Sequence, residues 1–164
     1  MSKSLDNLKE AFAGESQANR RYLAFARKAE QEGYHQVAKL FRAAAEAETV
    51  HAHNHLRAMK GVGTTAQNLE EAVEGENSEF RHMYPRMIAD AQAEGDKEAL
   101  RTFNFANEVE KVHARLFQKA LDNLDNKEEA DIYVCQVCGY TVEGEPPDKC
   151  PVCNANKKQF KSIV

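Results

Sequence analysis

Four cysteines near the end of the chain stand in two pairs with one spacing, Cys135-x-x-Cys138 and Cys150-x-x-Cys153. Two C-x-x-C motifs separated by only 11 residues can present four thiolate sulfurs to one metal ion in tetrahedral geometry. Four thiolates suit both iron and zinc, so the ligands leave the choice between these metals open. The spacing therefore predicts a four-cysteine metal site.

Glutamate and histidine form a second group of candidates, in residues 1–125. The motif Glu-x-x-His places both side chains on one face of a helix, and it occurs four times, ending at His35, His51, His82 and His113. Glutamate is so abundant in this chain that some matches are expected by chance. The motif alone does not identify a site, so the helix face on which each side chain lies has to sort the matches.

Helical geometry, at 100° per residue, shows which polar side chains share a face with the apolar residues that must form a core. A carboxylate on such a face has to be neutralised by something. His51 and His113 fall on apolar faces, and five glutamates either do so or, as Glu79 does, flank one at about 80°. The predicted ligands in this region are Glu15, Glu48, His51, Glu76, Glu79, Glu110 and His113.

The same geometry rejects several attractive residues. His82 lies about 140° from the centre of its apolar face and Glu108 about 160° from that of its own, so we expect both in solvent. His35 follows a turn glycine and His53 falls on a polar face, which predicts surface positions for both. His55 lies one turn beyond His51 and is either a hydrogen-bonded core histidine or a further metal contact.

Five inward carboxylates without compensating charge would cost several kcal/mol each, in sum about the stability of a whole domain. Metal ions are therefore expected among them. One glutamate from each of two helices, with Glu-x-x-His from each of the other two, is the ligand set of a di-iron or di-manganese carboxylate site. The sequence predicts such a site at the middle of a helical bundle.

The inward acids repeat along the chain. The spacing is 33 positions in the first half and 34 in the second, with a turn glycine between the two acids of each half. The pairs at these spacings are Glu15 with Glu48 and Glu76 with Glu110. An antiparallel hairpin around Gly33 would bring Glu15 level with Glu48, and one around Gly95 would bring Glu79 level with Glu110. Glu79 breaks this symmetry, because Ala18 stands at the equivalent position of the first half.

The elements that must carry these residues are helices. Residues 1–125 are rich in Ala, Glu, Leu, Lys and Arg, and glycines at Gly33, 61–63 and Gly95 divide them into four segments of about 25 to 30 residues. Four such segments predict an all-α four-helix bundle. Pro85 should kink the third helix. The G-x-G-x-x-A match at 61–66 follows no strand, so we interpret it as a loop rather than a dinucleotide site.

The expected domains are the bundle at 1–125, a polar linker at 126–131 and a small β-type domain at 132–164. About 33 residues cannot bury an adequate core without help, so the last domain should need its metal to fold. The composition, with a net charge of −4, 42% hydrophobic residues and no long apolar run, argues against a membrane span and a nucleic-acid partner. The N-terminus has no apolar signal segment, so we expect a cytoplasmic protein.

These motifs together resemble the rubrerythrin family over essentially the whole chain. The residues that carry the resemblance are Glu15, Glu48-Thr-Val-His51, Glu76-Asn-Ser-Glu79, Met83-Tyr84-Pro85, Glu110-Lys-Val-His113 and the four cysteines. The resemblance implies a ferritin-like bundle with two non-haem irons, a rubredoxin-like domain with one cysteine-bound iron, and reduction of hydrogen peroxide to water. The gap between the cysteine pairs is shorter than in full rubredoxins. Asn154 follows the second pair where glycine is common, and Asn tolerates left-handed backbone.

The resemblance also implies roles for single residues. Glu48 and Glu110 would bridge the two irons, and His51 would exchange with Glu79 as iron changes its oxidation state. Terminal ligands would be Glu15, Glu76, Glu79 and His113. Tyr22 and Tyr84 match tyrosines that hydrogen-bond to the carboxylates, although plain core aromatics would look the same. The implied partners are an external electron donor, either rubredoxin or an NAD(P)H-dependent reductase, and further copies of the chain in a head-to-tail dimer or a higher homo-oligomer.

Two other functions fit part of the sequence. A ferroxidase or iron-storage protein would use the same bundle acids without needing the cysteines. A zinc-ribbon interaction module would explain the cysteines and leave the inward acids unexplained. The choice between oxygen and peroxide as oxidant is open at this point.

Overall fold

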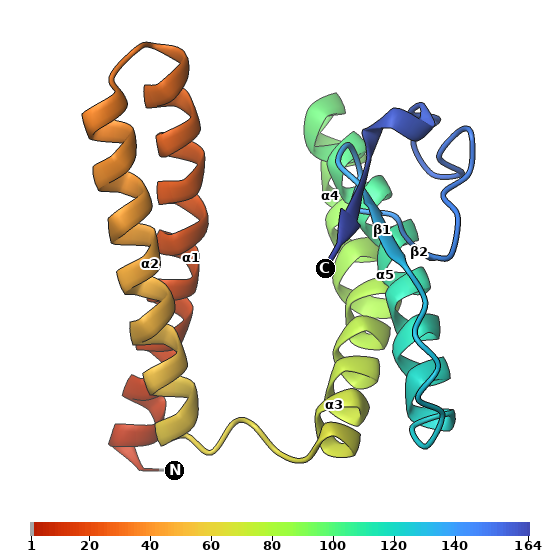
Figure 1. Ribbon diagram of the computed structural model, residues 1–164, viewed down its shortest axis with the longest axis horizontal. Helices are drawn as coiled ribbons and strands as arrows, with labels where there is room; N and C mark the ends of the chain where they lie inside the picture. The colour runs from red at the N-terminus through yellow and green to blue at the C-terminus, as the bar shows by residue number, and fades with distance from the viewer. Residues whose placement is uncertain (1) are drawn as a thin grey trace. The chain divides into compact units, whose positions relative to one another are not determined.

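The computed structural model describes residues 2–164, which divide into two compact units at residues 63 and 64 (Figure 1). The first unit is a pair of helices. The second holds further helices and a small sheet, and its helical part and its sheet are in contact.

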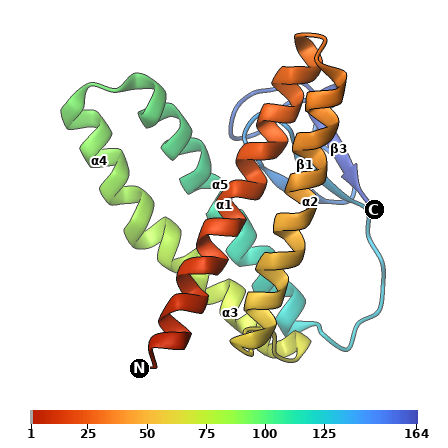
Figure 2. The ribbon, with the colours of Figure 1, turned by 90° about the vertical axis from the view of Figure 1, so that its left-hand side faces the viewer.

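The first hairpin consists of α1 (Lys3–Gln31) and α2 (His35–Ala58), which lie side by side and antiparallel (Figure 2). The Ser2 hydroxyl caps α1 by accepting from the Leu5 backbone N–H. Gly33 makes the reversal with φ of +83°, a left-handed value that glycine adopts without steric cost. Arg42 of α2 pairs with Glu30 of α1 across this end of the hairpin.

Alanines are the most buried residues in the contact between the two helices, which also includes the rings of Tyr22, Phe25 and Phe41. Ala38, Ala45 and Ala52, spaced by seven residues, are buried along α2, and Ala26 and Ala29 are buried along α1. Larger apolar residues of α2 remain exposed within the hairpin, where Val37 and Leu40 keep 44% and 66% of their surface. The apolar surface of α2 is thus wider than its row of buried alanines, here called the alanine seam, because two helices bury only a narrow strip between them.

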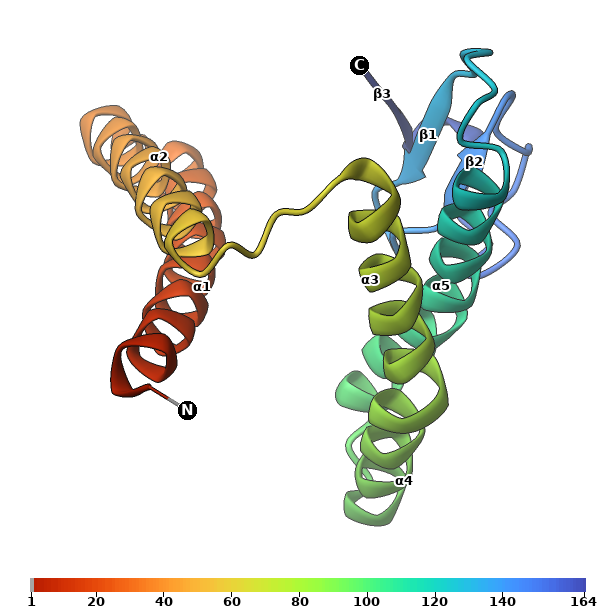
Figure 3. The same cartoon turned by 90° about the horizontal axis from the view of Figure 1, so that it is seen from below.

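The second hairpin begins with α3 (Thr65–Ser78), continues through the π-helical segment η1 (Glu79–Met83) into α4 (Tyr84–Glu94), and returns as α5 (Lys97–Asp122) (Figure 3). A capping box joins Thr64 and Gln67 at its start. At its turn, Gly95 has φ of +72° and the Asp96 carboxylate accepts from two backbone N–H groups of α5. The second hairpin is therefore closed by the same glycine-centred reversal as the first.

The kink predicted at Pro85 takes the form of the π-helical turn that precedes it. Proline has no N–H, and its ring collides with the carbonyl four residues earlier in a regular helix. In η1 the backbone N–H of Tyr84 bonds to the Glu79 carbonyl, a wider turn that places Pro85 in the first turn of α4. Proline is tolerated in that position because the N–H there needs no partner.

The cysteine domain, residues 132–164, contains a three-stranded antiparallel sheet with order β2-β1-β3. Its elements are β1 (Ile132–Cys135), β2 (Thr141–Glu143), the short helix η2 (Lys157–Gln159) and β3 (Phe160–Ile163). Tyr133 pairs with Val142 on one side and with Ser162 on the other. Its buried residues are Cys135, Pro146 and Cys150. So small a core is consistent with the expected need for a metal.

The fold class predicted from the sequence is confirmed, with long helices in the region 1–125 and a small sheet after it. The domain boundaries stay a prediction, as does the joining of all four helical segments into one bundle. None of the helices within residues 2–164 is long and apolar enough to cross a membrane.

Candidate metal centres

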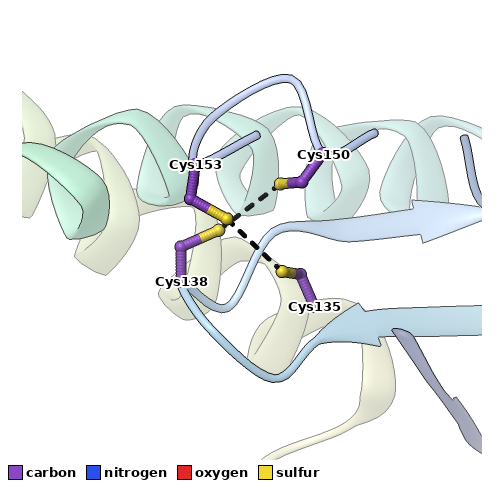
Figure 4. A group of neighbouring side chains, drawn as sticks. All are labelled: Cys135, Cys138, Cys150 and Cys153. Atoms are coloured by element: carbon purple, nitrogen blue, oxygen red, sulfur yellow. Dashed lines mark hydrogen bonds between the residues drawn. The ribbon is translucent and has the colours of Figure 1, made fainter. Parts of the chain in front are cut away.

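The four cysteine side chains converge on one point in the cysteine domain (Figure 4). The Sγ atoms of Cys135 and Cys153 are 3.7 Å apart and those of Cys138 and Cys150 are 3.5 Å apart. Four sulfurs about 2.3 Å from one metal ion would be about 3.8 Å from one another in a tetrahedron. The sulfurs thus already stand close to the spacing that a single tetrahedral ion requires.

The backbone turns back directly after each pair of cysteines. Gly139 and Asn154, the residues that follow the two pairs, have φ of +89° and +62°. The left-handed conformation expected for Asn154 is therefore present, and it turns the chain back after the second pair as Gly139 does after the first. These turns also aim backbone N–H groups at sulfur.

Burial and backbone hydrogen bonds shift the pKa values of three of the four cysteines. Burial raises the pKa of Cys138 and of Cys153. Burial acts in the same direction on Cys135, but hydrogen bonds from the backbone N–H groups of Val137 and Cys138 outweigh it and lower the Cys135 pKa. A site that favours one thiolate and resists further ones needs a cation before all four can ionise, as metal binding requires.

The first hairpin brings together Glu15, Glu48 and His51, with one ligand atom of each within 4.8 Å of the others. Glu48 Oε2 lies 2.8 Å from His51 Nδ1. The His51 side chain is 53% exposed within its hairpin, while Glu48 keeps 18% of its surface. Two helices thus supply a carboxylate–carboxylate–imidazole set.

The second hairpin repeats this set with Glu76, Glu110 and His113, again within 4.8 Å of one another. His113 Nδ1 is 2.7 Å from Glu110 Oε2 and 3.6 Å from Glu76 Oε1. All three residues are half-buried, and the His113 imidazole also touches the Phe117 ring. The two predicted Glu-x-x-His motifs on apolar faces are therefore the two that meet a third carboxylate.

The pKa values of two carboxyl groups at the second cluster, those of Glu76 and Glu79, are raised. Burial, and then the charge of Glu110, raise the pKa of Glu76 to about 7. Burial and Glu110 also raise the pKa of Glu79, while His113 opposes the change. Glu79 is not among the three convergent residues, but the charges of Glu110 and His113 act on its carboxyl, and its role as a ligand stays a prediction.

The same carboxylates act on Tyr84. Burial, followed by the charges of Glu110, Glu79 and Glu76, raises the pKa of its phenol. Tyr84 therefore stands beside the cluster and not simply in the core. Tyr22 of the first hairpin packs against the rings of Phe25 and Phe41.

Donor chemistry supports a metal at each helical cluster. Carboxylates with one imidazole suit iron and manganese, and their mutual repulsion, visible in the raised pKa of Glu76, is removed when a cation replaces the protons. Zinc or iron fits the four sulfurs equally well. The assignment of single ligands stays a prediction.

The residues rejected from the sequence are indeed outside these clusters. His82, His53 and Glu108 are exposed, and Glu108 pairs with Lys111. His35 contacts Glu30 rather than the glutamate of its motif. His55 is half-buried and belongs to neither cluster.

The sequence did not predict that Thr141 would contact the second cluster. The Thr141 hydroxyl of β2 lies 3.0 Å from His113 Nε2, joining the cysteine domain to the second cluster. The two residues are 28 positions apart in different domains, and no periodicity links them.

Comparison with known proteins agrees with both kinds of site. The family model described as rubrerythrin matches residues 6–121, and the model described as the rubredoxin-like domain of rubrerythrin matches 133–161. Rubrerythrin-2 of Clostridium acetobutylicum is 37% identical, covering 96% of this chain and 95% of its own. Nigerythrin of Nitratidesulfovibrio vulgaris is 35% identical, covering 96% and 85% respectively. A solved structure of partially reduced nigerythrin is similar, with a TM-score of 0.61 and 34% identity over 99% of this chain and 88% of the other.

Proposed function

This chain belongs to the rubrerythrin family, whose members carry a di-iron site and a rubredoxin-like four-cysteine iron site, and from that premise we propose that it is a hydrogen peroxide reductase. In this proposal peroxide is reduced to water at the carboxylate site. Electrons reach that site through the four-cysteine iron. The protein would thereby serve in defence against oxidative stress.

The observation that carries the proposal is the presence of two kinds of metal site in one chain. Carboxylate–imidazole clusters occur in both hairpins, and the second cluster is in contact with the cysteine domain through His113 and Thr141. When bound, two Fe(II) ions would supply the two electrons that, with two protons, convert one hydrogen peroxide to two water molecules. A storage protein or ferroxidase would have no use for a cysteine site that can pass on single electrons.

The residues of the two helical clusters and their neighbours have separate tasks in this proposal. Glu15, Glu48, Glu76, Glu110, His51 and His113 would hold the metals, and the resemblance gives Glu48 and Glu110 the role of ligands shared by both ions. Glu79 supplies a fifth carboxylate, which balances the additional positive charge of the oxidised metals and exchanges with His51. Tyr84 keeps its proton because burial and three neighbouring carboxylates raise its pKa, so the Tyr84 hydroxyl can donate a hydrogen bond into the site. We assign the same task to Tyr22.

The proposal includes partners and place. Electrons would come from rubredoxin or from an NAD(P)H-dependent reductase, and the chain would act as a homodimer or a higher homo-oligomer in the cytoplasm. Family membership supports an electron donor of the rubredoxin type, because the cysteine domain is itself rubredoxin-like.

Anaerobic stopped-flow mixing of the fully reduced protein tests the activity. We expect the visible Fe(III)–thiolate absorption to return fast after mixing with peroxide and slowly after mixing with air-saturated buffer. A faster return with oxygen would instead indicate an oxidase or ferroxidase. Absence of the band would mean that zinc occupies the cysteines, and electron relay through them would be wrong.

Glu79→Ala tests the role of the fifth carboxylate. We expect peroxide turnover to fall by about one to two orders of magnitude, the size typical of lost partners around a metal, while iron binding is partly kept. Glu108→Ala is the matched control on α5, because Glu108 is exposed and paired only with Lys111. Equal turnover in the two variants would contradict the role given to Glu79.

A further inference from the structure

His113 makes a second contact on the side of its ring away from the carboxylates. Its Nδ1 faces Glu110 at 2.7 Å, and its Nε2 lies 3.0 Å from Thr141 Oγ1 in β2 of the cysteine domain. Both groups are partly buried. Each ring nitrogen therefore has a partner, and the two partners come from different domains.

Counting hydrogens fixes the direction of the second bond. A threonine hydroxyl has one hydrogen, and that of Thr141 is directed at the Gly139 carbonyl oxygen, 3.1 Å away. The hydroxyl oxygen can then only accept from His113, so the imidazole carries its hydrogen on Nε2. The lone pair of the neutral ring is left on Nδ1, the nitrogen that faces Glu110 and Glu76.

From this contact we propose that Thr141 is a positioning residue for the metal ligand His113. Its hydroxyl holds the imidazole in the tautomer and orientation in which Nδ1 points at the metal position. Ligating histidines commonly use their other nitrogen in this way, and loss of the partner weakens metal binding by about 10- to 100-fold. The proposal requires that His113 binds a metal and does not depend on peroxide being the substrate.

The position of Thr141 depends on the folded cysteine domain. Thr141 pairs with Val134 in the sheet, and Gly139 directly follows Cys138 and donates its N–H to the Cys135 carbonyl. The site on the hairpin is therefore linked to the four-cysteine site by consecutive hydrogen bonds, from His113 to Thr141 to Gly139.

Other contacts hold the two surfaces together. Lys119 of α5 pairs with Glu143 of β2, and a Cβ placed on Gly139 would lie 3.7 Å from Val109 Cγ1 of α5. The side of α5 that carries His113 is thus the side on which the cysteine domain rests. Metal in the cysteine site, by folding this domain, should strengthen metal binding at His113.

Substitution of Thr141 tests the proposal by metal affinity. Thr141→Val keeps the shape and removes the hydroxyl, whereas Thr141→Ser keeps the hydroxyl. With iron held in the cysteine site, titration with Co(II) should show one of the two helical ions bound about 10- to 100-fold more weakly in Thr141→Val and nearly normally in Thr141→Ser. Thr102→Val, at an exposed position of α5, is the control for a lost threonine hydroxyl.

A measurement on the unaltered protein guards against a variant that fails to fold. With zinc in all sites, nitrogen NMR of His113 should show Nδ1 bound to metal and Nε2 protonated, with slow exchange of the Nε2 hydrogen. Thr141→Val, if it folds, should make this exchange fast. Coordination through Nε2, or affinity and exchange unchanged in a folded Thr141→Val protein, would overturn the proposal.

Discussion

The two helical hairpins carry the same donor set, yet only the second departs from regular helix. In the first hairpin Tyr22 follows Glu15 by seven positions along an unbroken α1. In the second, Tyr84 follows Glu76 by eight, and η1 lies between them. Seven residues of α-helix return a side chain to within about 20° of its starting face, whereas eight carry it about 80° away.

The π-helical turn absorbs this one additional residue. A π turn adds one residue to a helical turn without breaking the helix, and such turns occur often at functional sites. Here the turn allows Tyr84 to lie beside the carboxylates, as its raised pKa shows. It also begins at Glu79, the acid that has only Ala18 as its counterpart. The first hairpin thus keeps a regular helix beside its cluster, whereas the second adds a π-helical turn and the carboxylate of Glu79.

Deletion of His82 should remove the π-helical turn that distinguishes the second hairpin from the first, and it should have the largest effect on stability. His82 is exposed within η1, and its removal would turn the segment into a regular helix with Pro85 in its interior. Proline in a helix interior costs about 3 kcal/mol, so the free energy of unfolding should fall by about that amount in denaturant titration.

The matched control is the same deletion in a Pro85→Ala background. Alanine has no ring to collide and has its own N–H, so most of the loss should be recovered. An equal loss with and without Pro85 would show that the π turn does not exist to accommodate the proline.

The charge of the second cluster should appear as a pH dependence of the metal-free protein. The folded protein holds a proton on Glu76 up to about pH 7, whereas the unfolded chain loses it near pH 4.5. Because the unfolded state binds fewer protons in between, stability should fall as pH rises from about 4.5 to 7 and then level off. Melting temperatures of chelator-treated protein measure this directly.

Glu76→Gln sharpens that test, because glutamine cannot titrate. We expect the fall in melting temperature between these pH values to shrink in this variant, and bound metal to flatten it in the native chain. A slope as steep in Glu76→Gln as in the native protein would assign the dependence to other groups.

Stability of the first hairpin should be sensitive to larger side chains in the alanine seam. Ala45→Leu inserts a larger side chain where α1 and α2 are in closest contact, and overpacking of this kind costs about 1 to 3 kcal/mol. Ala43→Leu, at an exposed position of the same helix, should change stability by less than about 0.5 kcal/mol. Chemical denaturation compares the two, and similar losses would show that the seam is not tightly packed.

The smallest effect is expected at the ion pair between the second hairpin and the cysteine domain. Lys119 and Glu143 form an exposed ion pair between α5 and β2, and such pairs contribute about 0 to 1 kcal/mol. Lys119→Ala should therefore leave the melting temperature and Co(II) binding close to native values. A loss as large as that of Thr141→Val would make the ion pair, and not the hydroxyl, the main link between the domains.

Helical faces read from the sequence were sufficient to find the six residues of the two helical clusters and to reject His82 and Glu108. This succeeded because a carboxylate on an apolar face is a local signal, readable at 100° per residue. The four cysteines are equally local, since two residues separate each pair.

The packing of side chains within the hairpins could be predicted less well from the sequence. The first hairpin buries alanines of α2 and leaves the larger Val37 and Leu40 exposed, although all of them are apolar. Hydrophobicity predicts which side of a helix turns inward, but the distance between two helix axes decides whether small or large side chains fill the contact. The kink at Pro85 was foreseen, whereas its π-helical form depends on how the backbone redistributes its hydrogen bonds.

The sequence by itself determined the helices, the turns at Gly33 and Gly95, and the donor atoms of each site, because these follow from residue type and periodicity. Only the tertiary structure decided that the cysteine domain rests on α5 and that Thr141 meets His113. That meeting joins two surfaces separated by a polar segment without regular structure. Contacts of this kind depend on shape and on the pairing of single polar atoms, neither of which leaves a repeat in the sequence.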